Sequence, residues 1–170
     1  MKNYRFIFAL WLVLAAAACQ QAPKQESVAE SADNKEASSL QTDTIKVYNA
    51  YLQVKDNLVK SDGSAAKKSA GDLADHLKKI KGCSEAEDLA DKIGDTEDVK
   101  SQRMLFLQLS NDVIPLIKGM SNKAAPVYVA YCPMANEGKG GYWLSAQKEI
   151  KNPYYGDEML ECGEIKEEIK

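Results

Sequence analysis

Residues 99–120, VKSQRMLFLQLSNDVIPLIKGM, carry the strongest helical pattern in the chain. Mostly apolar residues recur at alternating intervals of four and three, in the series Val99, Arg103, Phe106, Ser110, Val113, Ile117 and Met120. This spacing puts the side chains on one face of an α-helix. The segment therefore predicts a long amphipathic helix that buries one face, which favours a mainly α-helical domain.

Three further helices are predicted before this segment. The first begins at Thr42 and ends at Ser61-Asp62-Gly63, where Gly63 is suited to the left-handed exit from a helix. The second runs from Ser64 to Lys81, and a short third helix runs from Ser84 to Gly94. Because the links between them are short, neighbouring helices are expected to pack antiparallel.

After Gly119 the sequence changes from helical to β-prone. Val127–Cys132 is rich in β-branched and aromatic residues, Gly141–Leu144 is a candidate short strand, and Cys162–Ile169 alternates in polarity. The predicted fold class is mainly α, an antiparallel helical bundle with a small C-terminal α+β lobe of loops and short strands.

The first 18 residues have the pattern of a bacterial export signal. Lys2 and Arg5 precede an apolar stretch from Phe6 to Ala18, which ends in small residues directly before Cys19. The stretch has 13 residues, whereas a membrane-spanning helix needs about 20. Residues 1–18 are therefore predicted to be a lipoprotein signal peptide, and Cys19 is predicted to carry the lipid that attaches the protein to the membrane.

The remaining chain divides into a tether and a domain. Residues 19–41 are small and polar without an apolar period, which predicts a disordered tether, and residues 42–170 form the domain. Gln20 rather than Asp follows the lipidated cysteine, which favours an outer-membrane lipoprotein that faces the periplasm. The formal net charge is −3 and no basic stripe is present, so nucleic acid is not an expected partner.

The four cysteines limit the possible disulfides. With Cys19 lipidated, the remaining cysteines are Cys83, Cys132 and Cys162. Three thiols permit at most one internal disulfide and leave one thiol over. An exported location permits such a bond to form.

The C-terminal lobe is rich in sulfur. Cys132, Met134, Met159 and Cys162 offer thiolate and thioether groups, which favour Cu(I) over harder ions. His76, the only histidine, could add a nitrogen ligand. Alternatively, Cys132 and Cys162 form a structural disulfide or remain buried thiols, and disulfide and metal could also alternate with the redox state.

Catalysis finds little support in the sequence. A nucleophilic cysteine needs a nearby base, and nothing places His76 beside a thiol. The chain has no glycine-rich phosphate loop, no serine elbow and no zinc signature of paired cysteines. The protein is therefore not expected to be an enzyme.

Four blocks in the C-terminal third resemble a bacterial domain family of unknown function. They are VYVAYCPMA at 127–135, GYWLS at 141–145, EIKNPYYGD at 149–157 and MLECGEI at 159–165. The resemblance extends over roughly Thr44 to Ile169. The family occurs in exported proteins and lipoproteins, and it also occurs appended to the periplasmic adaptor subunits of copper/silver efflux pumps. Its members often have histidine where this chain has Tyr131.

The resemblance implies a role in heavy-metal handling. It favours Cu(I) or Ag(I) binding at Cys132, Met134, Met159 and Cys162, for buffering or for handover to efflux components. The alternative is a non-catalytic protein-interaction module of the cell envelope with a structural Cys132–Cys162 disulfide.

Overall fold

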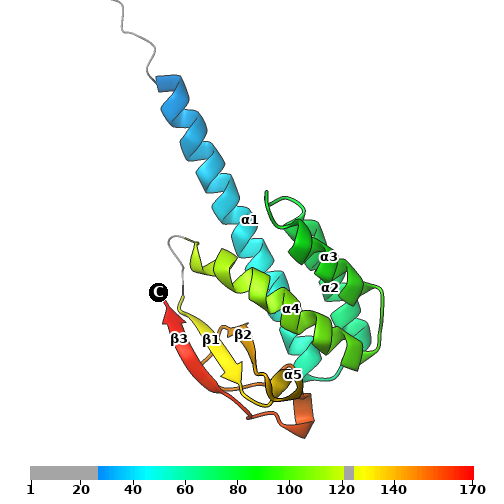
Figure 1. Cartoon of the computed structure of the whole chain (residues 1–170). Helices are drawn as coiled ribbons and strands as arrows, with labels where there is room; N and C mark the ends of the chain where they lie inside the picture. Colours follow the sequence, from blue (N-terminus) through cyan, green and yellow to red (C-terminus); the bar gives the residue numbers. More distant parts are fainter. Residues whose placement is uncertain (1–26, 121–124) are drawn as a thin grey trace, which may run out of the picture.

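The computed structural model describes residues 27–120 and 125–170, with side chains from residue 34 on. It has four long helices followed by a small sheet, which confirms the predicted mainly α fold with a C-terminal lobe (Figure 1). The elements are α1 (Ser27–Val59), α2 (Gly63–Leu77), α3 (Ser84–Gly94), α4 (Val99–Lys118), β1 (Val127–Cys132), α5 (Ala135–Gly138), β2 (Gly141–Ser145), the 3-10 helix η1 (Gly156–Glu158) and β3 (Glu164–Ile169).

The helices pack mainly on their neighbours in the chain, α1 against α2, α2 against α3 and α3 against α4. Their predicted apolar faces form one core, in which Leu58, Leu73, Ile93 and Phe106 are fully buried. Burying a side chain of this size contributes about 1.5–3 kcal/mol relative to leaving it exposed. The bundle is therefore held together by the apolar faces that the sequence pattern indicated.

Helix α1 is longer than predicted. It begins at Ser27 rather than at Thr42, so residues 27–41 are helical where a disordered tether was expected. Residues 34–40 are exposed, and the buried positions begin at Thr44. This segment has no apolar face, but it contains three Ala and two Glu, which have good helix propensity. Elongating an existing helix is also easier than starting one. Figure 1 shows this half of α1 standing clear of the bundle.

The turn from α1 to α2 also differs from the prediction. Ser61, with φ of 56°, takes the left-handed conformation that was assigned to Gly63. Gly63 is instead the first residue of α2, and a Cβ on it would overlap the carbonyl oxygen of Glu97. Gly63 is therefore needed for close packing between the start of α2 and the segment before α4.

The sheet has the strand order β2-β1-β3, and both pairings are antiparallel. β2 packs on α4, and its backbone is bonded to tyrosines outside the sheet. The Leu144 N–H donates to the Tyr51 hydroxyl at 3.2 Å, and the Tyr154 hydroxyl donates to the Tyr142 carbonyl. The edge strand β2 is thus capped by buried hydroxyl groups, and this joins the sheet to the bundle.

Aromatic rings fill the space between bundle and sheet. Tyr51 stacks on Phe106 with centroids 4.9 Å apart, and Phe106 lies 6.2 Å from Tyr154. Tyr154 in turn meets Trp143 of β2 edge-on at 5.8 Å. Such pairs contribute about 0.5–1.5 kcal/mol each beyond their buried area. The lobe is therefore packed on the bundle as part of one core.

The predicted signal peptide and the predicted lipid site at Cys19 lie outside the described residues. None of the helices in the described ranges combines the length and the hydrophobicity that a bilayer crossing demands.

Candidate functional site

Two thiols meet at one end of the sheet. Cys132 is the last residue of β1, and Cys162 lies two residues before β3. Because β1 and β3 run antiparallel, with Tyr131 opposite Glu164, the end of one strand lies beside the start of the other. The Sγ atoms of Cys132 and Cys162 are 2.9 Å apart, and both cysteines are free. The structure thus brings together the two cysteines that the sequence singled out.

The two thiols differ in access to solvent. Cys132 is fully buried, whereas Cys162 is partly exposed. Opposite Cys132, a Cβ on Gly141 would lie 3.0 Å from each of the side chains of Ala135, Leu107 and Tyr154. Gly141, the partner of Cys132 in the sheet, is therefore closely packed. Because Cys132 itself is buried, a reagent in solution reaches the pair from the side of Cys162.

Gly163 lets the backbone beside Cys162 approach the sheet. Its φ is +145°, and a Cβ on it would lie 2.8 Å from the Trp143 ring and 2.9 Å from the Tyr131 carbonyl oxygen. Only glycine can adopt this backbone angle and also fit into the small space beside Trp143 and Tyr131. Gly163 thereby allows Cys162 to lie next to the end of β1.

Asn152 holds the segment of Cys162 from the other side. Its side-chain amide donates to the Cys162 carbonyl at 2.8 Å, and its side-chain oxygen accepts the Tyr154 N–H at 2.8 Å. Its backbone N–H donates to the Leu160 carbonyl at 2.8 Å, and its carbonyl accepts the Gly156 N–H at 3.0 Å. Asn152 is fully buried. Sequence reasoning missed this role, for which the Asn-Pro turn at 152–153 was the only signal.

The pKa of the Cys162 thiol depends mainly on its contact with the Cys132 thiol. The hydrogen bond with the Cys132 thiol raises the pKa of the Cys162 thiol, and burial raises it further. A hydrogen bond with the Met134 backbone opposes this and lowers the Cys162 pKa, since an N–H donor stabilises a thiolate. The Cys162 thiol therefore favours its protonated form. A bound cation would have to displace this proton.

The structure gives main-chain hydrogen bonds for both predicted methionines. The Met134 carbonyl accepts the Tyr155 hydroxyl at 2.6 Å, and the Met159 carbonyl accepts the Cys162 N–H at 3.0 Å. The Met134 side chain is 52% exposed and that of Met159 is half-buried. Met134 is therefore a solvent-exposed thioether two residues after Cys132.

The turn after Cys132 is tightly wound. Asn136 and Glu137 have φ of 55° and 57°, and Gly138 follows with φ of 86°. Left-handed backbone costs a residue other than glycine about 1–2 kcal/mol. This turn leads the chain from the buried thiol back into β2 within eight residues.

The remaining candidates lie elsewhere in the fold. His76 is on α2, and its buried Nδ1 has no hydrogen-bond partner. Cys83 precedes α3, and burial raises the pKa of its thiol, as does the nearby Asp112. Within residues 27–120 and 125–170, no three His, Cys, Asp or Glu side chains form a group that could hold a metal ion.

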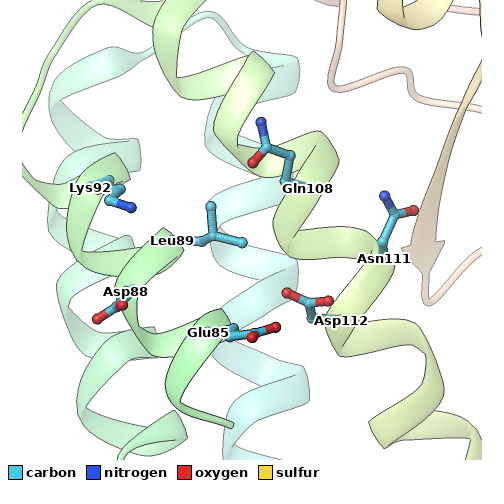
Figure 2. A pocket seen from close by; sticks show the side chains of 7 residues that line it. All are labelled: Glu85, Asp88, Leu89, Lys92, Gln108, Asn111 and Asp112. Carbon is cyan, nitrogen blue, oxygen red and sulfur yellow. The ribbon is translucent and has the colours of Figure 1, made fainter.

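Helices α3 and α4 form an open groove of about 380 Å³ that sequence reasoning missed. Figure 2 shows Leu89 near the middle of the groove, with Glu85 of α3 and Asp112 of α4 both below it in this view. The residues that line it are Glu85, Asp88, Leu89, Lys92, Gln108, Asn111 and Asp112. They recur at helical spacing on both helices, which is the signal that could have found them. The side chains that line the groove carry carboxylate and amide oxygens, and none of them contains sulfur.

The comparisons with known proteins concern the helical part of the chain. Residues 47–125 match a family described as "Protein of unknown function (DUF3347)". The match begins within α1 and ends before β1, so the lobe with Cys132 and Cys162 lies beyond it. No curated protein and no solved structure matches the chain with significance. The bundle is therefore similar to a domain of unknown function, and the thiol pair lies in the part of the chain that follows this domain.

Proposed function

We propose that this chain is a lipid-anchored protein facing the periplasm that binds a soft monovalent ion, Cu(I) or Ag(I), between Cys132 and Cys162. The ion is buffered there or passed to components of a heavy-metal efflux system. The observation that carries this proposal is the contact between the two thiols at the end of the sheet, with Sγ atoms 2.9 Å apart.

The donor set at this position suits a soft ion. Two thiolates select Cu(I)-like ions, whereas zinc generally requires four ligands in a tetrahedron. Among the described residues, no third His, Cys, Asp or Glu joins the pair. Met134 is the nearest additional soft donor in the chain sequence, two residues after Cys132.

Binding requires the two sulfurs to separate. A metal–sulfur bond is about 2.3 Å long, so sulfurs on opposite sides of an ion lie up to about 4.6 Å apart. The side chain of Cys162 can supply this movement by rotation, because it is only partly buried. Cys132 can remain in its packed position at the end of β1.

The open side of the pair supports exchange of the ion. Cys162 is partly exposed, and Met134 is 52% exposed. A donor or an acceptor can therefore reach the ion without opening the core. This access fits buffering or handover better than permanent storage.

The alternative is a non-catalytic interaction module in which Cys132 and Cys162 form a structural disulfide. The same contact favours it, because a bond between these residues would join β1 to the segment before β3. A disulfide of this kind typically contributes about 2–4 kcal/mol. The two functions differ in one property, since only the first predicts metal uptake by the reduced protein.

Titration of the reduced, tag-free full chain in mild detergent with Ag(I), and with Cu(I) against a chromophoric chelator, tests the proposal. We expect uptake of about one ion per chain, and we expect Cys132→Ser with Cys162→Ser to abolish it. Cys83→Ser is the matched control, because Cys83 is also a free thiol but lies before α3. Equal affinity in the double variant and the parent would show the proposal to be wrong. No uptake by the reduced parent, with a disulfide in protein isolated from cells, would favour the alternative.

A further inference from the structure

The two cysteines of the pair differ in their access to solvent. Cys132 has no exposed surface, and Leu107 and Tyr154 pack closely around Gly141, its partner in the sheet. Cys162 is partly exposed. A dissolved reagent must therefore meet the Cys162 sulfur first, and Cys132 can react only with what is already attached to Cys162.

From this arrangement we infer that Cys132 and Cys162 form a reversible dithiol–disulfide centre, with Cys162 as the attacking thiol and Cys132 as the resolving thiol. The co-reactant is a low-molecular-weight disulfide of the glutathione type. This activity goes beyond metal binding and does not depend on it.

The reaction has two exchange steps. In the first, the Cys162 thiol loses its proton to solvent and its sulfur attacks one sulfur of the external disulfide. A mixed disulfide forms, and one external thiolate leaves and takes up a proton. In the second step, the Cys132 thiol loses its proton and attacks the Cys162 sulfur, which forms the internal bond and expels the second external thiol. The two cysteines are oxidised by one electron each, and the external disulfide is reduced to two thiols.

The fold brings the two sulfurs of the second step together before they react. Cys132 is fixed within β1, and Asn152 and Gly163 hold the backbone on either side of the Cys162 carbonyl. The resolving sulfur therefore already lies against the sulfur that it must attack. Positioning of this kind converts a reaction between molecules into a faster one within a molecule, so the mixed disulfide should not accumulate.

Access to solvent assigns the attacking thiol, because Cys162 is partly exposed and Cys132 is buried. Forming the internal disulfide removes both thiols as possible metal ligands. If the proposed metal binding is correct, oxidation therefore also closes the metal site.

The test compares three forms of the full chain, all carrying Cys19→Ser and Cys83→Ser so that only this pair of thiols remains. Each is reduced, mixed with oxidised glutathione, quenched with acid and weighed by mass spectrometry. With both cysteines present we expect an internal disulfide, two hydrogens lighter, without a lasting adduct. Cys132→Ser should retain one glutathione on Cys162. Cys162→Ser should react at least about tenfold more slowly, because Cys132 is buried.

Two results would overturn the inference. One is equal adduct formation by Cys132→Ser and Cys162→Ser, and the other is a lasting adduct or no disulfide when both cysteines are present. Cys132→Ala is a second variant in case serine disturbs the packing, and circular dichroism checks that each variant is folded. Titrating the reduced protein with Ag(I) separates the two proposals. Disulfide formation without Ag(I) uptake would support the redox centre and contradict metal binding. Ag(I) uptake without disulfide formation would support metal binding and contradict the redox centre.

Discussion

The guanidinium of Arg103 occupies the space that a side chain on Gly156 would need. Arg103 donates from Nε to the Pro153 carbonyl at 3.0 Å, and from Nη2 to the Leu58 carbonyl at 3.0 Å and to the Ser61 hydroxyl at 2.9 Å. One side chain of α4 thus joins the end of α1 to the turn that precedes η1. The fold of the lobe depends on this junction as well as on its own strands.

Gly156→Ala should lower the free energy of unfolding by about 2–4 kcal/mol, because the new methyl group overlaps Arg103 and because φ at this position is +57°. Urea denaturation measures the change. Gly71→Ala is the matched control, since a Cβ there meets nothing within 4 Å, and we expect it to leave stability unchanged or to raise it by up to about 1 kcal/mol. Similar effects of both substitutions would contradict the role of the junction.

Tyr51→Phe should lower the free energy of unfolding by about 1–3 kcal/mol. The Tyr51 hydroxyl is buried and bonded to the Ser110 hydroxyl at 2.7 Å and to the Leu144 N–H at 3.2 Å, so its removal takes a partner from each of these groups. Thermal and urea unfolding provide the measurement. Tyr142→Phe, at a residue that is 42% exposed, should have little effect. An unchanged Tyr51→Phe variant would show that the cap on β2 contributes nothing to stability.

The stability of the fold should fall at alkaline pH. Burial raises the pKa of Tyr48 from 10.0 to about 12 and also raises the pKa values of Tyr51 and Tyr154. The unfolded chain releases these protons near pH 10, whereas the folded chain keeps them, so stability is present in full below pH 10 and is lost as pH rises towards 12.

Urea midpoints at about pH 8 and about pH 10.5, followed together with tyrosinate absorbance, check the alkaline loss of stability. If every tyrosine of the folded protein titrated with a midpoint near pH 10, the burial of these hydroxyl groups would be refuted.

Asn152→Asp should loosen the segment of Cys162. The carboxylate has almost the same shape but lacks the N–H that donates to the Cys162 carbonyl, and it places two acceptors against each other in a buried position. We expect a loss of about 2–4 kcal/mol and faster reaction of Cys162 with a thiol reagent. The rate of thiol labelling measures the second effect. Asn136→Asp, at an exposed residue, should change neither quantity.

Cys19→Ser should release the protein from the membrane fraction, because it removes the predicted site of lipid attachment. Fractionation of cells with immunodetection measures this, and mass spectrometry of the N-terminal peptide detects the lipid directly. The variant Cys83→Ser should remain in the membrane fraction. A Cys19→Ser variant that stays membrane-bound would contradict the lipoprotein prediction.

The sequence predicted those elements whose signals are local. β1 was predicted at Val127–Cys132 and α3 at Ser84–Gly94, with the bounds that the structure has. Both segments combine a clear apolar pattern with turn or capping residues on either side. The start of α1 was wrong because residues 27–41 have no apolar face, so only helix propensity and continuity with the packed half could extend it.

The sequence singled out the two cysteines that the structure brings together, but it did not identify the residues that hold them in place. Cys132 and Cys162 stood out by type, and their position at the ends of predicted strands allowed them to meet. The roles of Asn152 and Gly163 depend on contacts with residues ten or more positions away, such as the bond from Asn152 to Cys162 and the approach of Gly163 to Trp143. Spacing in the sequence carries no information on such contacts.

The length of α1 has a consequence for where partners can act. A helix of 33 residues is about 50 Å long. The end of β1 and α5 lie at the end of the molecule away from the start of α1 (Figure 1). With an anchor before this helix, an upright arm would hold the thiols tens of ångströms above the bilayer surface. A soluble carrier would then meet them freely, whereas a membrane-embedded complex would have to project outward by a similar distance or wait for the arm to tilt. Deleting helical turns from residues 27–41 would therefore change the choice of exchange partner without altering a single atom of the thiol pair.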